Sequence, residues 1–168
     1  MPIPRGKTIR LKAAALSVCA AALVAALTGC PKPPKPLPGS PKASKIEVQV
    51  YVAPDANSGN PVALDLVLVR DKELLEKLKG MSAAEWFERR AQIMLDNPKE
   101  GALVVTHWEW VPGQVIKAHV ERVAPEVRAA VVFANYFNPG EHRAVLDPRR
   151  NVLLKLGESK LEVSQVKK

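Results

Sequence analysis

Cysteine, histidine and serine side chains are common nucleophiles and bases in catalysis, and this chain contains all three. The two cysteines are Cys19 and Cys30, and there are three histidines. None of the serines after the N-terminal region lies in a Gly-x-Ser-x-Gly context, the setting that exposes a nucleophilic serine at a sharp turn. The sequence also has no glycine-rich loop of the kind that cradles phosphates. We therefore predict no catalytic residues and interpret the folded part of the chain as a non-enzyme.

A β-hairpin is predicted where strand signals at 102–110 and 115–121 flank a Pro-Gly turn. A three-residue loop, Pro112 to Gln114, would pair Trp110 with Ile116 and keep the apolar side chains, including both tryptophans of the first strand, on one face. A slip of one residue would move every side chain to the other face, which favours this register.

The same register suggests the single metal hypothesis that the sequence offers. It sets His107 opposite His119, with Glu109 two residues along the strand. Two imidazoles and a carboxylate are ligands that zinc accepts. No fourth ligand or supporting partner is identifiable, and His142 lies in a loop-like segment. We interpret this face as an ordinary solvated surface and predict no metal site.

The N-terminal region has the parts of a bacterial export signal. Four basic residues before position 13 precede an apolar run, 13–26, which has only Ser17 as a polar interruption. At ~1.5 Å per residue the run is too short to span a ~30 Å hydrocarbon core comfortably. It ends at Leu27-Thr28-Gly29-Cys30, which resembles the bacterial lipobox. We interpret residues 1–29 as a signal peptide that is removed before Cys30.

That resemblance implies the chemistry of Cys30. In such signals the thiol receives a diacylglycerol and the new amino terminus is acylated, so we expect these covalent lipids and no other cofactor. Cys19 would be discarded, which leaves no disulfide in the mature chain. Pro31 stands where an aspartate would signal retention in the inner membrane, so the expected location is the periplasmic face of the outer membrane.

The distribution of charge separates a tether from a folded domain. The chain has 25 basic and 17 acidic side chains, but eight of the basic ones and none of the acids lie in residues 1–45. Residues 46–168 are therefore balanced, whereas a nucleic-acid-binding domain carries a basic excess. Residues 31–45 are rich in proline and lysine, which predicts an extended spacer. We expect a tether over 30–45, a domain over 46–168 and no nucleic-acid partner.

Period-two alternation predicts a mainly β domain. Strands are expected at 46–52, 62–69, 102–110, 115–121, 127–137, 151–156 and 160–166. Two helices are expected between the second and third strands. Asp71 would cap the first helix and Gly80 would end it, while Ser82 begins a capping box for the second. The apolar stripe of that second helix is predicted to be Ala83, Phe87, Ala91 and Met94.

Together these features resemble the outer-membrane lipoproteins of type VI secretion systems, the TssJ family. The resemblance covers most of residues 46–156. It rests on the lipoprotein signal, the proline-rich tether, the first strand Ile46 to Val52, the polar loop after it and the Leu-Val-Leu-Val-Arg-Asp segment ending at Asp71. It also includes Trp86-Phe87, and the segment Arg128 to Phe137, which resembles the family's penultimate strand.

The resemblance implies a transthyretin-like β-sandwich with a small two-helix insert between strands two and three. It also implies a scaffold that binds the periplasmic domain of a large inner-membrane, TssM-like subunit through the loop between the first two strands. The partner-binding residues would then be Asp55, Ala56, Asn57, Ser58, Gly59 and Asn60. Turn chemistry alone also explains this composition. Two other functions remain open: a pilotin or assembly lipoprotein of another secretion or pilus system, and a periplasmic ligand-binding lipoprotein.

Overall fold

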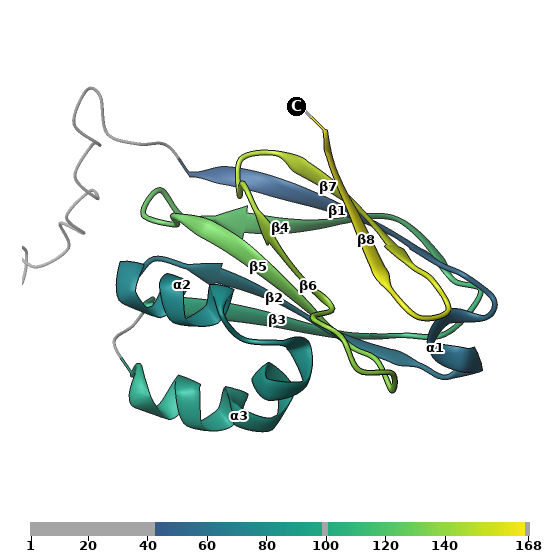
Figure 1. Ribbon diagram of the computed structural model, residues 1–168. Helices are drawn as coiled ribbons and strands as arrows, with labels where there is room; N and C mark the ends of the chain where they lie inside the picture. Colours follow the sequence, from purple (N-terminus) through teal and green to yellow (C-terminus); the bar gives the residue numbers. More distant parts are fainter. Residues whose placement is uncertain (1–42, 99–100, 167–168) are drawn as a thin grey trace, which may run out of the picture. The chain divides into compact units, whose positions relative to one another are not determined.

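Eight strands form two four-stranded sheets, one with the order β4-β1-β7-β8 and the other with the order β3-β2-β5-β6 (Figure 1). The computed structural model describes residues 43–98 and 101–166. The strands are β1 (Ser44–Val52), β2 (Val62–Val69), β3 (Leu103–Trp110), β4 (Val115–Val123), β5 (Ala129–Asn135), β6 (Arg143–Leu146), β7 (Asn151–Leu156) and β8 (Leu161–Val166). The helices are α1 (Ala56–Gly59), α2 (Lys72–Lys79) and α3 (Ala83–Asp96).

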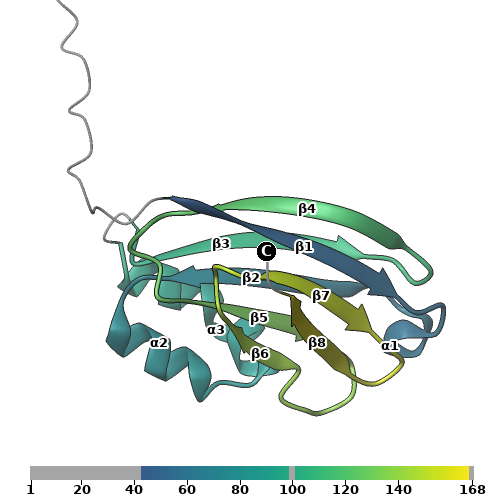
Figure 2. The ribbon, with the colours of Figure 1, turned by 90° about the horizontal axis from the view of Figure 1, so that it is seen from above.

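The two sheets pack face to face as a sandwich (Figure 2). All neighbouring strands are antiparallel except β1 and β7, which run parallel. On β1 the buried side chains Ile46, Val48, Val50 and Val52 alternate with more exposed ones, as expected for a strand with one face on a core. The predicted β-sandwich with a small helical insert is confirmed.

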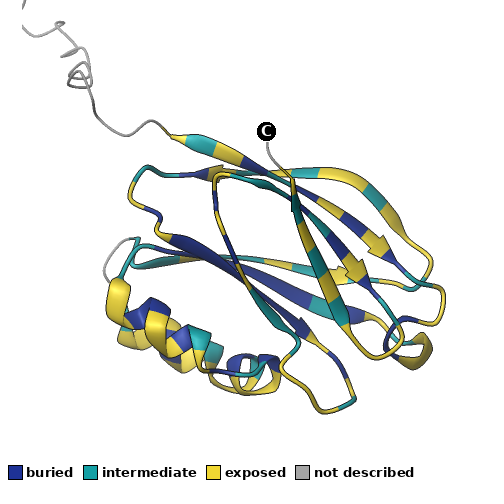
Figure 3. Ribbon diagram, turned by 45° about the horizontal axis from the view of Figure 1, so that its top comes forward, coloured by how far each residue is buried: buried dark blue, intermediate teal, exposed yellow. Residues whose placement is uncertain are grey.

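The helices α2 and α3 cover the outer face of the β3-β2-β5-β6 sheet (Figure 1). The central strands β2 and β5 are therefore buried on both faces, which explains why their sequences are nearly continuous apolar runs. Figure 3 shows this concentration of buried residues. A second core forms between sheet and helices, in which Trp86 stacks on Phe133 with ring centroids 5.0 Å apart.

Both helices begin where the capping signals place them. The Asp71 carboxylate accepts a hydrogen bond from the Leu74 amide. The Ser82 hydroxyl accepts one from the Glu85 amide, and the Glu85 carboxylate accepts one from the Ser82 amide, which completes the capping box. The Ser82 amide and the Ser82 hydroxyl both donate to the Glu85 carboxylate, and these two bonds lower the pKa of Glu85 below its usual value because they favour the ionised form.

The predicted apolar stripe of α3 is wrong in part. The buried residues are Ala83, Trp86 and Ile93, with Phe87 half-buried, whereas Met94 is 48% exposed and Ala91 is exposed as well. The stripe follows the face that can reach Phe133 and the sheet. The amphipathic pattern of α3 is therefore rotated by about one residue relative to the prediction.

The strand predictions miss β6, a four-residue strand that pairs with β5. Such a short segment carries too little alternation to be recognised. Three strands follow β5, so the segment 128–137 does not hold the penultimate strand that the resemblance suggested. The predicted signal peptide and all but the last residues of the predicted tether lie outside the described residues. Within the part of the chain that is described, no helix is long and apolar enough to cross a membrane.

Candidate functional site

The loop between β1 and β2 connects the two sheets and contains an unusual left-handed turn. Asn57 has φ 47° and ψ 42°, Ser58 has φ 55° and ψ 40°, and Gly59 has φ 82°. The left-handed region disfavours residues with a Cβ, and Asn and Gly tolerate it best. The Asn-Ser-Gly sequence therefore suits this backbone, which persists only because the surrounding contacts hold it.

Asn57 supplies those contacts from a buried position. Its side chain is 2% exposed. Its amide nitrogen donates to the Pro61 carbonyl at 2.9 Å, and its amide oxygen accepts from the Phe137 backbone amide at 2.8 Å. Asn57 thus closes its own loop and joins it to the β5–β6 loop, which is 80 residues away in the sequence.

The outer surface of the loop is formed by four of the six predicted partner-binding residues. Asp55, Ser58 and Gly59 are exposed and Asn60 is half-buried. The side-chain amide of Asn60 donates to the carbonyls of Asn57 and Ser58, at 3.1 Å each, and so stiffens the turn from outside. Ala56 and Asn57 are buried, so they support the loop and cannot offer side chains to a partner.

The β5–β6 loop lies beside this turn and presents an aromatic ring. Phe137 is 76% exposed. The preceding Tyr136 is buried, stacks on His142 with centroids 4.5 Å apart, and donates from its hydroxyl to the Lys160 carbonyl at 3.0 Å. Burial raises the pKa of the Tyr136 phenol well above its usual value. The loop is thus anchored at Tyr136 while Phe137 faces solvent, a feature that sequence reasoning missed because exposure of a single aromatic has no local signal.

The predicted hairpin between 102–110 and 115–121 is wrong, because β3 pairs with β2 and β4 pairs with β1. The Gln114 amide donates to the Val111 carbonyl, and Gly113 has φ 84°, which fits a type II turn with proline and glycine at its centre. Turns of this hand splay the flanking strands instead of pairing them. The connection therefore sends its two strands into different sheets.

The histidines of the zinc hypothesis consequently lie in separate environments. His107 faces the helix layer, whereas His119 packs its ring edge against Trp108, with centroids 4.8 Å apart, and contacts Glu121 at 2.8 Å. The pairing of β4 with β1 also shifts register at a β-bulge between Ile116 and His119 of β4. Among the described residues, no group of three or more histidine, cysteine, aspartate and glutamate side chains could hold a metal ion. The two tryptophans do share a face, with centroids 6.0 Å apart.

A buried carboxylate, Asp65, organises the contact between the helices and the sheet. Its side chain accepts from Trp86 Nε1 and from Arg90 Nη1, both at 2.9 Å, and lies 2.5 Å from His107 Nδ1. It is completely buried, while the side chains of Arg90 and His107 are 36% and 48% exposed. The sequence signal was a single carboxylate inside the apolar run Val62–Val69, which we did not single out.

Several solved structures resemble this chain in fold. The T6SS lipoprotein TssJ1 from Pseudomonas aeruginosa has a TM-score of 0.58 at 15% identity, covering 76% of this chain and 99% of its own. Serratia marcescens Lip, a membrane-bound component of the type VI secretion system, has a TM-score of 0.54 at 16% identity, covering 71% and 96%. A chain in the structure of the T6SS protein TssM C-terminal domain (869-1107) from EAEC has a TM-score of 0.53 at 12% identity, covering 73% and 98%.

The chain has the fold of the TssJ lipoproteins. No family model matches its sequence, and no curated protein matches it either. Sequence identities this low do not transfer a function from one protein to another. The likeness therefore establishes the TssJ-like fold alone. In this TssJ-like fold the β1–β2 loop and Phe137 share one end of the sandwich, opposite the end at which β1 begins (Figures 1 and 2).

Proposed function

We propose that this protein is a lipid-anchored, non-enzymatic scaffold of a type VI secretion membrane complex. Cys30 carries the lipid at the periplasmic face of the outer membrane. The domain binds the periplasmic part of a TssM-like inner-membrane subunit and so links the two membranes. The observation that carries the proposal is the TssJ-like fold, since the solved structures that share it are of type VI secretion proteins, among them a lipoprotein and a membrane-bound component.

The proposed contact surface is the β1–β2 loop with Phe137 beside it. Two properties of this end suit protein binding. The left-handed turn is held by hydrogen bonds from Asn57 and Asn60, so little ordering entropy is lost when a partner binds. An exposed aromatic ring next to a polar, preorganised loop is the composition of a binding hot spot with its rim.

A pull-down with paired variants tests the proposed surface. Asp55→Arg/Ser58→Arg adds bulk and three units of positive charge to the exposed loop. Glu88→Arg/Ala91→Arg makes the same charge change on the exposed side of α3. We expect the unmodified protein and the α3 pair to retain the purified periplasmic domain of a TssM-like subunit, and the loop pair to lose it. Equal retention by both pairs would remove the loop from the interface.

The identity of the captured protein separates this proposal from the pilotin alternative. A lysate of a bacterium that carries this protein should yield the large inner-membrane subunit. Recovery of an outer-membrane secretin in its place would contradict the type VI assignment. The anchor is tested by membrane fractionation of Cys30→Ser, which we expect to become soluble after a salt wash while the domain stays folded.

A further inference from the structure

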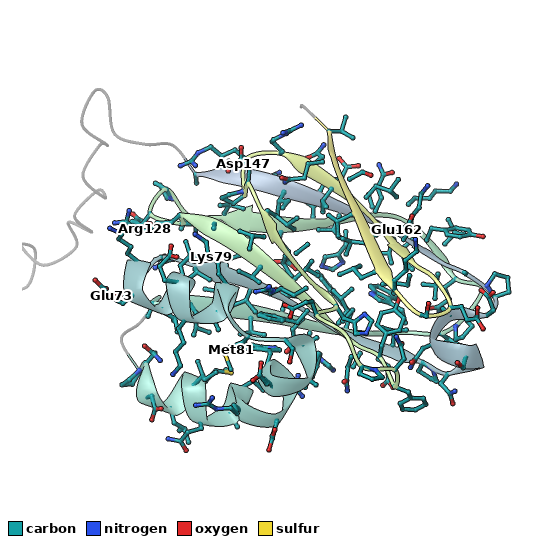
Figure 4. The ribbon with its side chains drawn as sticks, in the orientation of Figure 1. Glu73, Lys79, Met81, Arg128, Asp147 and Glu162 are labelled. Atoms are coloured by element: carbon teal, nitrogen blue, oxygen red, sulfur yellow. The ribbon has the colours of Figure 1, made fainter. Side chains whose placement is uncertain are left out.

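Three arginines meet around a surface depression of about 510 Å³ at the end of the sandwich where β1 begins. They come from distant parts of the sequence. Arg70 follows β2, Arg128 precedes β5, and Arg149 lies between β6 and β7. The remaining lining residues are Pro125, Glu126 and Val127. Figure 4 places Arg128 at this end of the molecule, away from α1.

The backbone holds the first two arginines together. The Arg128 amide donates to the Val69 carbonyl, and its Nε donates to the Arg70 carbonyl, each at 2.8 Å. The guanidinium of Arg70 lies over Gly101, where an added Cβ would be only 1.8 Å from Nη1. Gly101 therefore makes room for the arginine, which is positioned by the fold.

No ion pair within the described part of the chain involves Arg70, Arg128 or Arg149. Nε of Arg70 is buried without a hydrogen-bond partner in that same part, although a buried donor without a partner is unfavourable. Among the described residues that line the depression the acid is Glu126, against three arginines, so this lining has an excess of cationic donors. Planar guanidinium groups suit oxyanions, which they bind through two parallel hydrogen bonds.

The position of the depression relates it to the predicted anchor. Ser44, the first residue of β1, pairs with Val123, and the β4–β5 connection that follows Val123 lines the depression. The chain therefore enters the domain beside the arginines. Cys30 lies 13 residues before Ala43 in the sequence, a distance that an extended proline-rich tether spans with roughly 40 Å of reach. The arginine end is thus the end that the anchor would hold near the bilayer.

We propose that Arg70, Arg128 and Arg149 form a site for the phosphate groups of anionic phospholipids in the membrane that carries the anchor. The contact orients the sandwich with its arginine end on the bilayer and the β1–β2 loop directed away from it. The inference goes beyond the proposed scaffold function. It would hold for any partner at the other end, but it relies on the predicted lipid at Cys30 for its choice of ligand.

Vesicle binding by the unlipidated protein tests the site. The chain from residue 30 with Cys30→Ser is suitable, because every side chain of the two cores lies between Ile46 and Val163. We expect it to bind phosphatidylcholine vesicles that contain phosphatidylglycerol more tightly than pure phosphatidylcholine vesicles. Arg128→Gln/Arg149→Gln in this chain should weaken the binding about twenty-fold, since each arginine near an anionic surface contributes about five-fold.

Two controls distinguish a built site from general attraction. Arg89→Gln/Lys155→Gln removes the same charge from exposed positions outside the depression and should leave binding within about two-fold of the unmodified chain. Arg128→Lys keeps the charge but loses the planar donor pair, and should weaken binding several-fold. Thermal melts of each variant show whether the fold is intact.

Four results would overturn the inference. Equal loss in the two Gln pairs would mean a diffuse charge effect, and full binding by Arg128→Lys would mean the same. Equal binding to vesicles with and without phosphatidylglycerol would exclude recognition of the anionic lipid. Saturable binding of inorganic phosphate at constant ionic strength, without any vesicle binding, would assign the site to a soluble phosphate compound. None of these results would affect the pull-down of the TssM-like partner.

Discussion

The two ends of the sandwich are built by different means. At the β1–β2 end, hydrogen bonds from Asn57, Tyr136 and Asn138 tie three loops together, and Arg143 pairs with Glu141 at 2.6 Å. At the other end, three arginines without ion pairs in the described residues surround a depression. A charge-balanced domain thus contains one end whose loops are held together by hydrogen bonds and another end suited to anions.

This difference shows why net charge alone is a poor guide to the partners of this domain. Residues 46–168 carry equal numbers of acidic and basic side chains. Their pairing is uneven, however, and an unpaired guanidinium attracts an oxyanion whatever the sum over the domain. A mutation at one end should therefore change binding at that end alone. A mutation in the core between the two ends should affect binding at both.

The largest effect is expected from Asp65→Ala, between the two ends. It leaves the indole nitrogen of Trp86 buried without a partner, whereas Arg90 and His107 can regain water. Loss of a buried partner of this kind costs about 3 kcal/mol. Urea unfolding should show this loss, and Glu88→Ala on the exposed side of α3 should change little. If Asp65→Ala lost binding of the TssM-like domain or of vesicles without losing stability, Asp65 would act in binding and not only in stability.

Asn57→Ala should have the next largest effect and should act on one end. It leaves the Phe137 amide and the Pro61 carbonyl without their partner and places alanine in the left-handed region. We expect a loss of about 2 kcal/mol in the free energy of unfolding. Hydrogen exchange at the Phe137 amide should accelerate while vesicle binding stays unchanged.

Asn138→Ala is the matched control for this change, because Asn138 is half-buried and its side-chain amide donates to the Ser159 carbonyl in an exposed hydrogen bond. Its effect on stability should be well below that of Asn57→Ala. Equal effects would show that burial of Asn57 does not matter, and weakened vesicle binding in either variant would show that the two ends are coupled.

Phe137→Ala should change binding without changing stability. Its ring is 76% exposed and contributes to neither core. If it is a hot spot for the TssM-like domain, its removal should lower affinity about ten-fold. Isothermal titration calorimetry measures this change, with Leu95→Ala, at an α3 residue 72% exposed, as the comparison. The same affinity in both variants would remove Phe137 from the contact.

The smallest effect expected is on the pH dependence of stability, through Tyr136 at the β1–β2 end. Burial raises the pKa of Tyr136 in the folded state, so the protonated phenol is favoured there. The stability that it contributes is complete below the unfolded pKa of about 10 and is lost as pH rises toward the folded value. Thermal melts above pH 10 should show this decline, and it should be shallower in Tyr136→Phe. That variant should lose about 1 kcal/mol at neutral pH with the hydrogen bond to Lys160. A decline of the same steepness in Tyr136→Phe would assign it to another group.

Local patterns predicted most of the elements. The strands β2 and β7 lie where alternation and apolar runs place them, and the caps at Asp71 and Ser82 form as their types predict. The β1–β2 loop was identified by its turn residues and, with the family resemblance, as a candidate contact. The burial of Asn57 within this loop was not predicted, because it depends on a hydrogen bond from the Phe137 amide in another loop.

What the sequence by itself determined, therefore, is most of the elements and their approximate ends, since periodicity, capping and turn chemistry act within a few residues. The tertiary structure decided which strands pair, and so sent β3 and β4 into different sheets. It also brought Arg70, Arg128 and Arg149 to one depression across 79 residues of sequence. Neither result is local, because both depend on how the two sheets and the helices pack together in the assembled domain.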